Sequence, residues 1–186
     1  MHDTAVPSKA DAIATVQRGD RALARLLARL PPRALTRPGI GGGDWSPVDL
    51  VGHLESWERH ALGALAAWAR RERAPIEVAL RTHGLDAVNA EELEANAGRP
   101  PAAVLRRALD THAELVAALR EISDDAWHRP PLTSGRPLAL RVGGILGGPG
   151  GPFRHADAHL PDLRAFVEGS GARRDVRQMR PSGSRA

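Results

Sequence analysis

Apolar residues recur at intervals of three and four positions along most of the chain, and this spacing predicts α-helices. Between Ser8 and Leu30 they form a seam typical of a helix in an antiparallel bundle. The members of the seam are Ala12, Val16, Gly19, Leu23, Leu26 and Leu30. Pro31 and Pro32 follow directly and predict the end of this helix, because proline cannot continue the backbone hydrogen-bond pattern.

A second helix is predicted from Ser46 to about Arg70. Ser46 is a typical N-cap, Pro47 suits the first helical position, and Asp49 follows at the spacing of a capping box. The apolar stripe of this helix consists of Leu50, Leu54, Trp57, Ala61, Leu65 and Trp68. We interpret the two tryptophans of the stripe as core residues.

Two further long helices are predicted in the second half of the chain. One begins near Pro101 and ends near Ser123, and its apolar face holds Leu105, Leu109, His112, Val116 and Leu119. The other lies in PFRHADAHLPDLRAFVEG and is expected to bend at Pro161. The connection from 74 to 100 is less regular, with room for a short helix from Gly84 to Ala97.

The glycine-rich run GGILGGPGG precedes the last predicted helix. It has no strand before it and no GK[ST] after it, which weighs against a phosphate-binding loop. We interpret the run as a flexible wall beside a pocket.

The composition also favours helices, since 32 residues are Ala, 22 are Leu and aromatic residues make up 3%. We therefore expect an all-α protein, an antiparallel four-helix bundle with long irregular connections, as one domain over residues 1–168. The net charge of +4 arises from the residues after Gly169, which include five arginines and one aspartate. Residues 169–186 are thus predicted to be a flexible, disordered Arg-rich tail, and nucleic acid is not an expected partner. The clusters ARRERA and LRRALD are interpreted as solvated helix faces.

The location of the protein and the chemistry open to it are limited by what the sequence lacks. No apolar stretch approaches the roughly 20 residues of a membrane span, and the N-terminus lacks the pattern of a signal peptide, so we expect a cytoplasmic protein with no membrane partner. Cysteine is absent, which excludes disulfides, thiolate metal ligands and a cysteine nucleophile. Any catalytic sulfur must therefore come from a bound molecule.

Three histidines are candidate metal ligands. His155 and His159 lie one turn apart on the last predicted helix, and His53 lies on the inward side of the second. Three neutral imidazoles from two helices suit a divalent ion such as zinc or nickel with an open position. The alternative for His53 is a hydrogen bond to a backbone carbonyl.

The other histidines have different expected roles. His60 lies about 10 Å further along the helix than His53, too far for the same ion, so we expect it behind the ligands or at the surface. His112 is expected in the core or a cleft. The remaining three, His2, His83 and His128, are expected in solvent.

The segments WSPVDLVGHLESWE and HADAHLPDLRAF resemble the DinB-like four-helix bundle superfamily, over about residues 8–168. This superfamily includes thiol-dependent S-transferases, mycothiol-dependent maleylpyruvate isomerases and a colibactin self-resistance branch. The resemblance implies metal ligands at His53, His155 and His159, and it matches Trp45, Ser46 and Asp49 to the start of the second helix. The glycine-rich approach to the last helix departs from the family pattern and predicts that His155 lies in a frayed first turn.

The resemblance implies a metal-dependent enzyme of small-molecule metabolism. The first hypothesis is transfer or isomerisation, in which a low-molecular-weight thiol such as mycothiol attacks an electrophilic metabolite. The second is a metal-hydroxide hydrolase or self-resistance protein acting on an electrophilic natural product, and the third is a non-catalytic metabolite-binding bundle. Candidate general bases are Glu58, Glu55 and His112. The expected partner is a small-molecule substrate, and a homodimer is left open.

Overall fold

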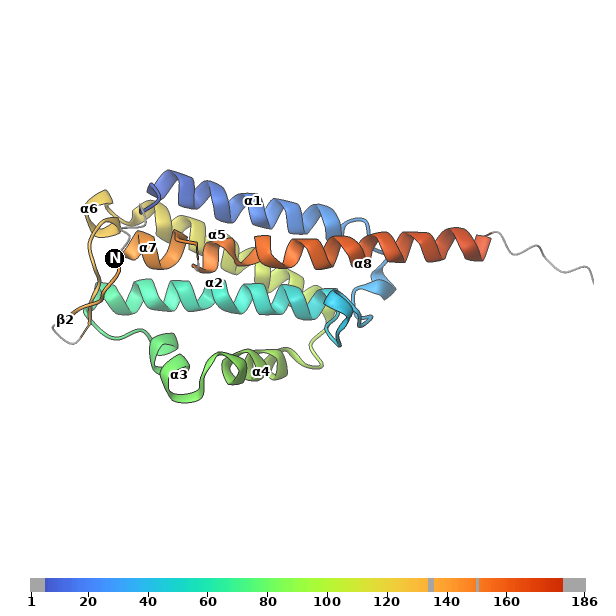
Figure 1. Cartoon of the computed structure of the whole chain (residues 1–186), viewed down its shortest axis with the longest axis horizontal. Coiled ribbons are helices and arrows are strands. Elements are labelled where there is room, and N and C mark those ends of the chain that lie inside the picture. Colours follow the sequence, from blue (N-terminus) through green and yellow to red (C-terminus); the bar gives the residue numbers. More distant parts are fainter. Residues whose placement is uncertain (1–5, 134–135, 150, 179–186) are drawn as a thin grey trace, which may run out of the picture.

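The computed structural model describes residues 6–133, 136–149 and 151–178, and these are mostly helical (Figure 1). The long helices are α1 (Lys9–Leu27), α2 (Pro47–Ala69), α5 (Pro101–Glu121) and α8 (His155–Gln178). The short helices are α3 (Pro75–His83), α4 (Leu85–Asn96), α6 (Asp124–Trp127) and α7 (Val142–Gly147), with 3-10 turns η1 (Pro32–Ala34), η2 (Ile40–Gly42) and η3 (Pro152–Arg154). Two short antiparallel strands, β1 (Leu132–Thr133) and β2 (Arg136–Pro137), pair with each other. The predicted all-α class is confirmed.

The four long helices form the bundle, and α3 and α4 lie along the outside of α2 (Figure 1). α2 runs antiparallel to α8, and α1 runs antiparallel to α5. α2 and α5 run in the same direction, because α3 and α4 return the chain along α2 before α5 begins. This parallel pair sets equivalent turns of α2 and α5 side by side, so that Glu55 meets Thr111 and Glu58 meets His112.

Two apolar clusters fill opposite ends of the bundle. One surrounds Leu115, Leu119 and Trp127, and the other surrounds Leu50, Leu163 and Phe166. Charged and imidazole side chains of all four long helices lie between these clusters, at the middle of the bundle. The polar groups inside the protein are therefore concentrated at the middle of the bundle.

The first two helices agree closely with the sequence. Every member of the α1 seam is buried, and α2 begins with the predicted capping box. The Ser46 hydroxyl accepts from the Asp49 N–H, and the Asp49 carboxylate accepts from the Ser46 N–H at 2.8 Å. These bonds fix the start of α2 two turns before His53.

Two expectations for α5 are corrected. Leu109 was placed on the buried face, but it is 61% exposed, because α5 packs through Val104, Leu115 and Leu119. Arg107 belongs to the LRRALD cluster that was interpreted as solvated, yet its guanidinium lies 3.0 Å from the buried carboxylate of Glu55. The buried acid thus draws one arginine of the cluster inward.

The connections contain more helix than the sequence predicts. α3 begins at Pro75 in a stretch that was expected to be irregular, whereas α4 confirms the short helix expected from Gly84 to Ala97. Part of the glycine run forms α7, where a Cβ on Gly143 would lie 2.4 Å from the Trp127 ring. Glycine is therefore needed there for close packing, in addition to any role in a pocket wall.

The last helix is longer than expected. α8 continues through Pro161 and past Gly169 to Gln178, beyond residue 169, where the tail is predicted to begin. Near this point the Ser170 hydroxyl donates to the Phe166 carbonyl and accepts from Arg37, which ties the helix to the loop before α2. Residues 179–186 of the predicted tail lie outside the described residues.

Among the described residues, no helix combines the length and the apolar character that crossing a membrane would require.

Candidate metal centre

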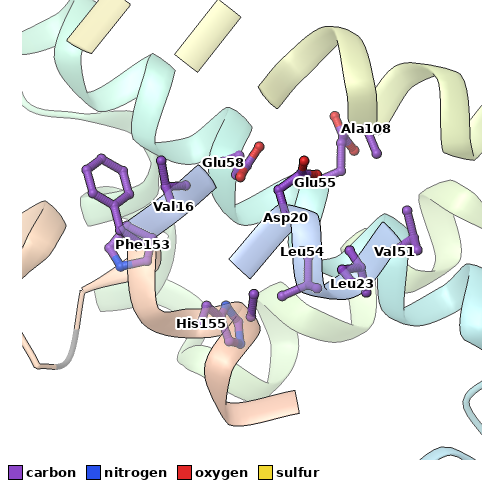
Figure 2. Close-up of a pocket in the computed structure, with 12 residues that line it drawn as sticks. Val16, Asp20, Leu23, Val51, Leu54, Glu55, Glu58, Ala108, Phe153 and His155 are labelled. Atoms are coloured by element: carbon purple, nitrogen blue, oxygen red, sulfur yellow. The ribbon is translucent and has the colours of Figure 1, made fainter. Parts of the chain in front are cut away.

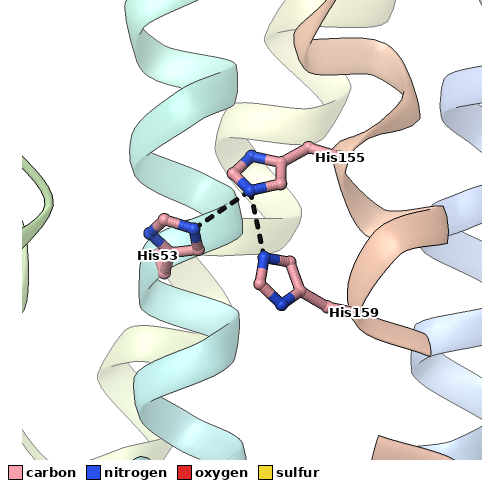
Figure 3. A group of neighbouring side chains, drawn as sticks. All are labelled: His53, His155 and His159. Atoms are coloured by element: carbon pink, nitrogen blue, oxygen red, sulfur yellow. Dashed lines mark hydrogen bonds between the residues drawn. The ribbon is translucent and has the colours of Figure 1, made fainter. Parts of the chain in front are cut away.

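The structure brings His53, His155 and His159 together at the middle of the bundle (Figure 3). His155 is the first residue of α8, as expected for a first turn, and His159 follows one turn later. The His155 Nε2 atom lies 3.1 Å from Nε2 of His53 and 3.0 Å from Nε2 of His159. One nitrogen from each of the three rings therefore points toward a shared position.

Hydrogen bonds alone cannot satisfy this arrangement. The Nε2 atom of a neutral imidazole either donates one hydrogen or accepts through one lone pair, so His155 Nε2 can serve only one of its two neighbours well. A cation accepts all three lone pairs. Three ligands of a tetrahedral zinc at about 2.05 Å would lie about 3.3 Å apart, close to the spacings observed here. The donor set thus fits a divalent ion.

The electrostatics of the cluster keep the rings neutral. Burial, followed by the neighbouring imidazoles His155 and His159, lowers the pKa of His53 to about 3. Burial and the charge of His159 lower the pKa of His155 to about 4, and burial also lowers the pKa of His159. At neutral pH all three rings are in the form that binds a metal.

Two tryptophans enclose the cluster. The Trp45 ring packs against His53 with the ring centroids 4.8 Å apart, and it stacks over His159 at 6.4 Å. The loop before α2 holds Trp45 in place, because the backbone carbonyl of Trp45 accepts hydrogen bonds from the N–H groups of Gly39 and Ile40. Gly39 has a φ of 129°, a backbone conformation that favours glycine. Trp57 lies on the other side, 5.6 Å from the His155 ring.

Trp57 departs from its predicted role. It was interpreted as core packing, but it is only partly buried, and its indole N–H donates to Asn89 of α4 at 3.3 Å. It also lines a pocket of about 330 Å³ that includes His155 and Leu85. Trp68 is 8% exposed, which confirms the core interpretation for that residue.

A small cavity of about 40 Å³ lies on the inner side of His155 (Figure 2). Glu58, Glu55 and Asp20 line it together with apolar side chains and His155 itself. The Glu58 Oε1 atom lies 3.0 Å from Nδ1 of His112, and Asp20 lies 3.8 Å from Nε2 of the same ring. The two candidate bases Glu58 and His112 are thus a hydrogen-bonded pair beside the candidate centre.

The comparisons with known proteins identify the family and the fold. The family model described as "Mycothiol maleylpyruvate isomerase N-terminal domain" matches residues 16–145, more than two-thirds of the chain. The chain belongs to this family. The matched region includes His53 and ends before His155, so the family match covers one of the three candidate ligands.

One solved structure has the same fold as this member of the mycothiol maleylpyruvate isomerase family. It is the crystal structure of an uncharacterised protein from Escherichia coli UTI89, with a TM-score of 0.67 and 16% sequence identity. The alignment covers 91% of this chain and 96% of the other. No curated protein matches the chain.

Glu55, the third candidate base, lines the same cavity as Glu58, but its carboxylate is engaged by other side chains. Its side chain is fully buried and bonded to Arg59 at 2.9 Å, to Arg107 at 3.0 Å and to the Thr111 hydroxyl at 3.1 Å. Both carboxylate oxygens are engaged, so Glu55 holds α2 and α5 together and has no free oxygen for proton transfer.

The remaining histidines are spread over the molecule. His60 lies behind the centre, with its ring 5.6 Å from Trp57 and its Nε2 atom 3.2 Å from a Glu92 oxygen. His83 and His128 are exposed, as expected. His2 lies outside the described residues.

Sequence reasoning missed several residues of the site. Asp20 belongs to the α1 helix, where a single charged residue resembles any solvated position, and Asn89 lies in the irregular connection. Trp45 was noted only as part of the helix start. Trp45 directly precedes the N-cap of α2, two turns before His53, and this position in the sequence could have indicated that its ring lies beside the site.

Proposed function

We propose that this protein is a metal-dependent enzyme in which His53, His155 and His159 hold a divalent ion, zinc or nickel, and a low-molecular-weight thiol reacts with an electrophilic metabolite by transfer or isomerisation. The observation that carries the proposal is the convergence of three Nε2 atoms on one position. When bound there, a divalent ion would lower the pKa of a coordinated thiol or water toward neutrality.

The residues around the centre have separate tasks in this proposal. The neutral imidazoles supply the lone pairs, and the Trp45 and Trp57 rings limit access of bulk water from two sides. The pocket beside His155 gives room for a thiol and its reaction partner. Because the chain has no cysteine, no protein thiol competes with the thiol for the metal. The name of the family supports mycothiol as the thiol.

A second function is favoured by the inner cavity. A volume of about 40 Å³ is enough for a water molecule, and Glu58 lies at its wall opposite His155. Glu58 would accept the proton of that water, and the His112 ring would hold the carboxylate in place. This arrangement suits hydrolysis of an electrophilic natural product, as in a self-resistance protein.

A thermal-shift experiment tests the thiol proposal. Mycothiol should raise the Tm of zinc- or nickel-loaded protein by several degrees and should have no effect after chelation or in His53→Ala. The matched control is His83→Ala, an exposed histidine outside the three-histidine cluster, which should behave as wild type. An equal shift with and without metal would contradict the proposal.

Glu58→Gln separates the two chemistries. If water is the nucleophile, this variant should lose about 10²–10⁴-fold in turnover of the hydrolysed electrophile while retaining its metal. If the thiol is the nucleophile, thiol-dependent turnover should persist in the variant.

A further inference from the structure

One pocket among the described residues does not contain any of the three candidate ligands. It has a volume of about 440 Å³ and lies between α2, α3, α7 and the segment after β2. Its floor on α2 includes His60, Ala61 and Ala64, and Leu138 and Leu140 form part of its rim. We call this the distal pocket. Its volume lies in the range of small-molecule sites.

The walls of the distal pocket are apolar. Of the described residues that line it, only His60 and Glu77 can ionise, and none is lysine or arginine. Glu77 already accepts a hydrogen bond from the Trp68 indole at 2.8 Å. A carboxylate or phosphate placed here would lose its hydration without gaining a cationic partner. The pocket therefore suits an uncharged, apolar guest.

The imidazole in the distal pocket wall is paired with a neighbouring acid. His60 Nε2 is buried, and a Glu92 oxygen lies 3.2 Å away on α4, outside the pocket lining. His60 therefore adds no exposed cationic atom to the pocket wall, in keeping with an uncharged guest.

Trp57 connects the distal pocket with the candidate metal centre. It lines both the distal pocket and the pocket beside His155, and Pro152 does the same. The Trp57 ring lies 5.6 Å from the His60 ring and 5.6 Å from the His155 ring. Its hydrogen bond to Asn89 holds the indole in this position.

We propose that the distal pocket binds the uncharged, apolar body of the substrate, while the reactive end of the same molecule passes Trp57 toward His155. The placement of the reactive end at His155 rests on the proposed function. The binding of the apolar body in the distal pocket does not. The exposure of Leu140, which is 60% at the rim, fits the same guest, because a large apolar side chain there gains from contact with it.

A pair of fluorescent probes tests the pocket without any metal. N-phenyl-1-naphthylamine is uncharged, and 1-anilinonaphthalene-8-sulfonate has the same rings with one sulfonate. The full chain should bind one molecule of the uncharged probe and bind the sulfonate at least tenfold more weakly. Equal affinity for the two probes, or no saturable binding of the first, would overturn the proposal.

Variants locate the probe. Ala64→Leu fills the floor of the distal pocket and should weaken binding of the uncharged probe at least tenfold, whereas Ala66→Leu, exposed on the same helix, should leave it unchanged. Leu140→Ser at the exposed rim carries little risk to folding and should weaken binding about threefold. Unchanged affinity in folded Ala64→Leu and in Leu140→Ser would place the probe elsewhere and refute the site.

The link to the centre is tested with straight-chain hydroxamic acids, which bind metals through the head group. In metal-loaded wild type, affinity should rise about fourfold per methylene, and in Ala64→Leu it should not depend on chain length. A chain-length series that is flat in wild type would refute the route past Trp57. If the protein binds the uncharged probe but takes up no metal, the proposed function is refuted and the distal pocket is supported. If it takes up metal but does not bind the probe, the distal pocket is refuted and the metal centre is supported.

Discussion

Glu55 shows how a single residue organises the middle of the bundle. Its carboxylate is fully buried, and the partners Arg59 and Arg107 reach it with guanidinium groups that stay partly exposed. A buried charge with such partners is stable only while the pairing is complete. Glu55 therefore contributes to holding the parallel helices α2 and α5 in register, and this register sets Glu58 beside His112.

We predict that Glu55→Gln lowers the free energy of unfolding by about 2 kcal/mol, because it leaves Arg107 without its anionic partner inside the bundle. The measurement is urea unfolding. Glu72→Gln, which removes an exposed pair with Arg70, is the control and should cost about 0.5 kcal/mol or less. Equal losses in the two variants would refute the role of Glu55.

His112 provides a prediction of pH dependence. Burial lowers its pKa, but the Glu58 hydrogen bond and the charges of Glu58 and Asp20 outweigh burial and Arg21, so the pKa is raised above 6.5. Protonated His112 therefore stabilises the fold fully below pH 6.5, and this contribution is lost as the pH rises through the raised pKa.

Wild type should lose stability above pH 6.5 more steeply than His112→Asn, as measured by urea unfolding between pH 6 and pH 9. His53, His155 and His159 are present in both proteins, so their lowered pKa values affect the two profiles equally and cancel in the comparison. Parallel pH profiles for the two proteins would show that His112 is not protonated by its neighbours.

At the scale of elements, the docking of α4 on α2 depends on a glycine. A Cβ on Gly52 would lie 2.9 Å from the Asn96 amide nitrogen. Asn96 cannot move aside easily, because its amide donates to the Glu92 carbonyl and accepts from Arg107. The same face of α4 holds Glu92 against Arg59 at 2.7 Å and Asn89 against Trp57. The short helix thus positions the tryptophan beside the centre.

Two glycine variants in the same helix test this docking. Gly63 has nothing within 4 Å of a built Cβ, so Gly63→Ala should stabilise the protein by about 0.5–1 kcal/mol through helix propensity. Gly52→Ala gains the same propensity but must displace Asn96, and its net effect should be destabilising. The measurement is the free energy of unfolding of both variants in urea. Stabilisation by Gly52→Ala would show that the packing of α4 on α2 does not depend on glycine at position 52.

At the scale of the whole molecule, the sequence predicts the parts that repeat with a helical period. The α1 seam, the capped start of α2 and the inward histidines all follow from local spacing, because each depends on one helix only. The shared direction of α2 and α5 depends instead on how α3 and α4 return the chain, and no residue pattern within a long helix indicates it. Leu109 and Arg107 were misplaced for this reason, since the face that α5 buries is set by α2 and Glu55.

The candidate site divides in the same way. His155 and His159 share a helix, and the distance to His53 follows once the bundle is assumed. The enclosure by Trp45, the pairing of Asp20 with His112 and the distal pocket are all contacts between segments distant in the chain. They required the fold, because their residue types are common on solvated helices and in loops.

The measurement that tests the central claim most directly is metal analysis of the purified protein after exposure to zinc and nickel. Wild type is predicted to hold about one divalent ion per chain. His53→Ala and His159→Ala are predicted to lose it while remaining folded, and His60→Ala is predicted to keep it. Wild-type protein that carries no stoichiometric metal under these conditions would contradict the account of the three histidines as a metal centre.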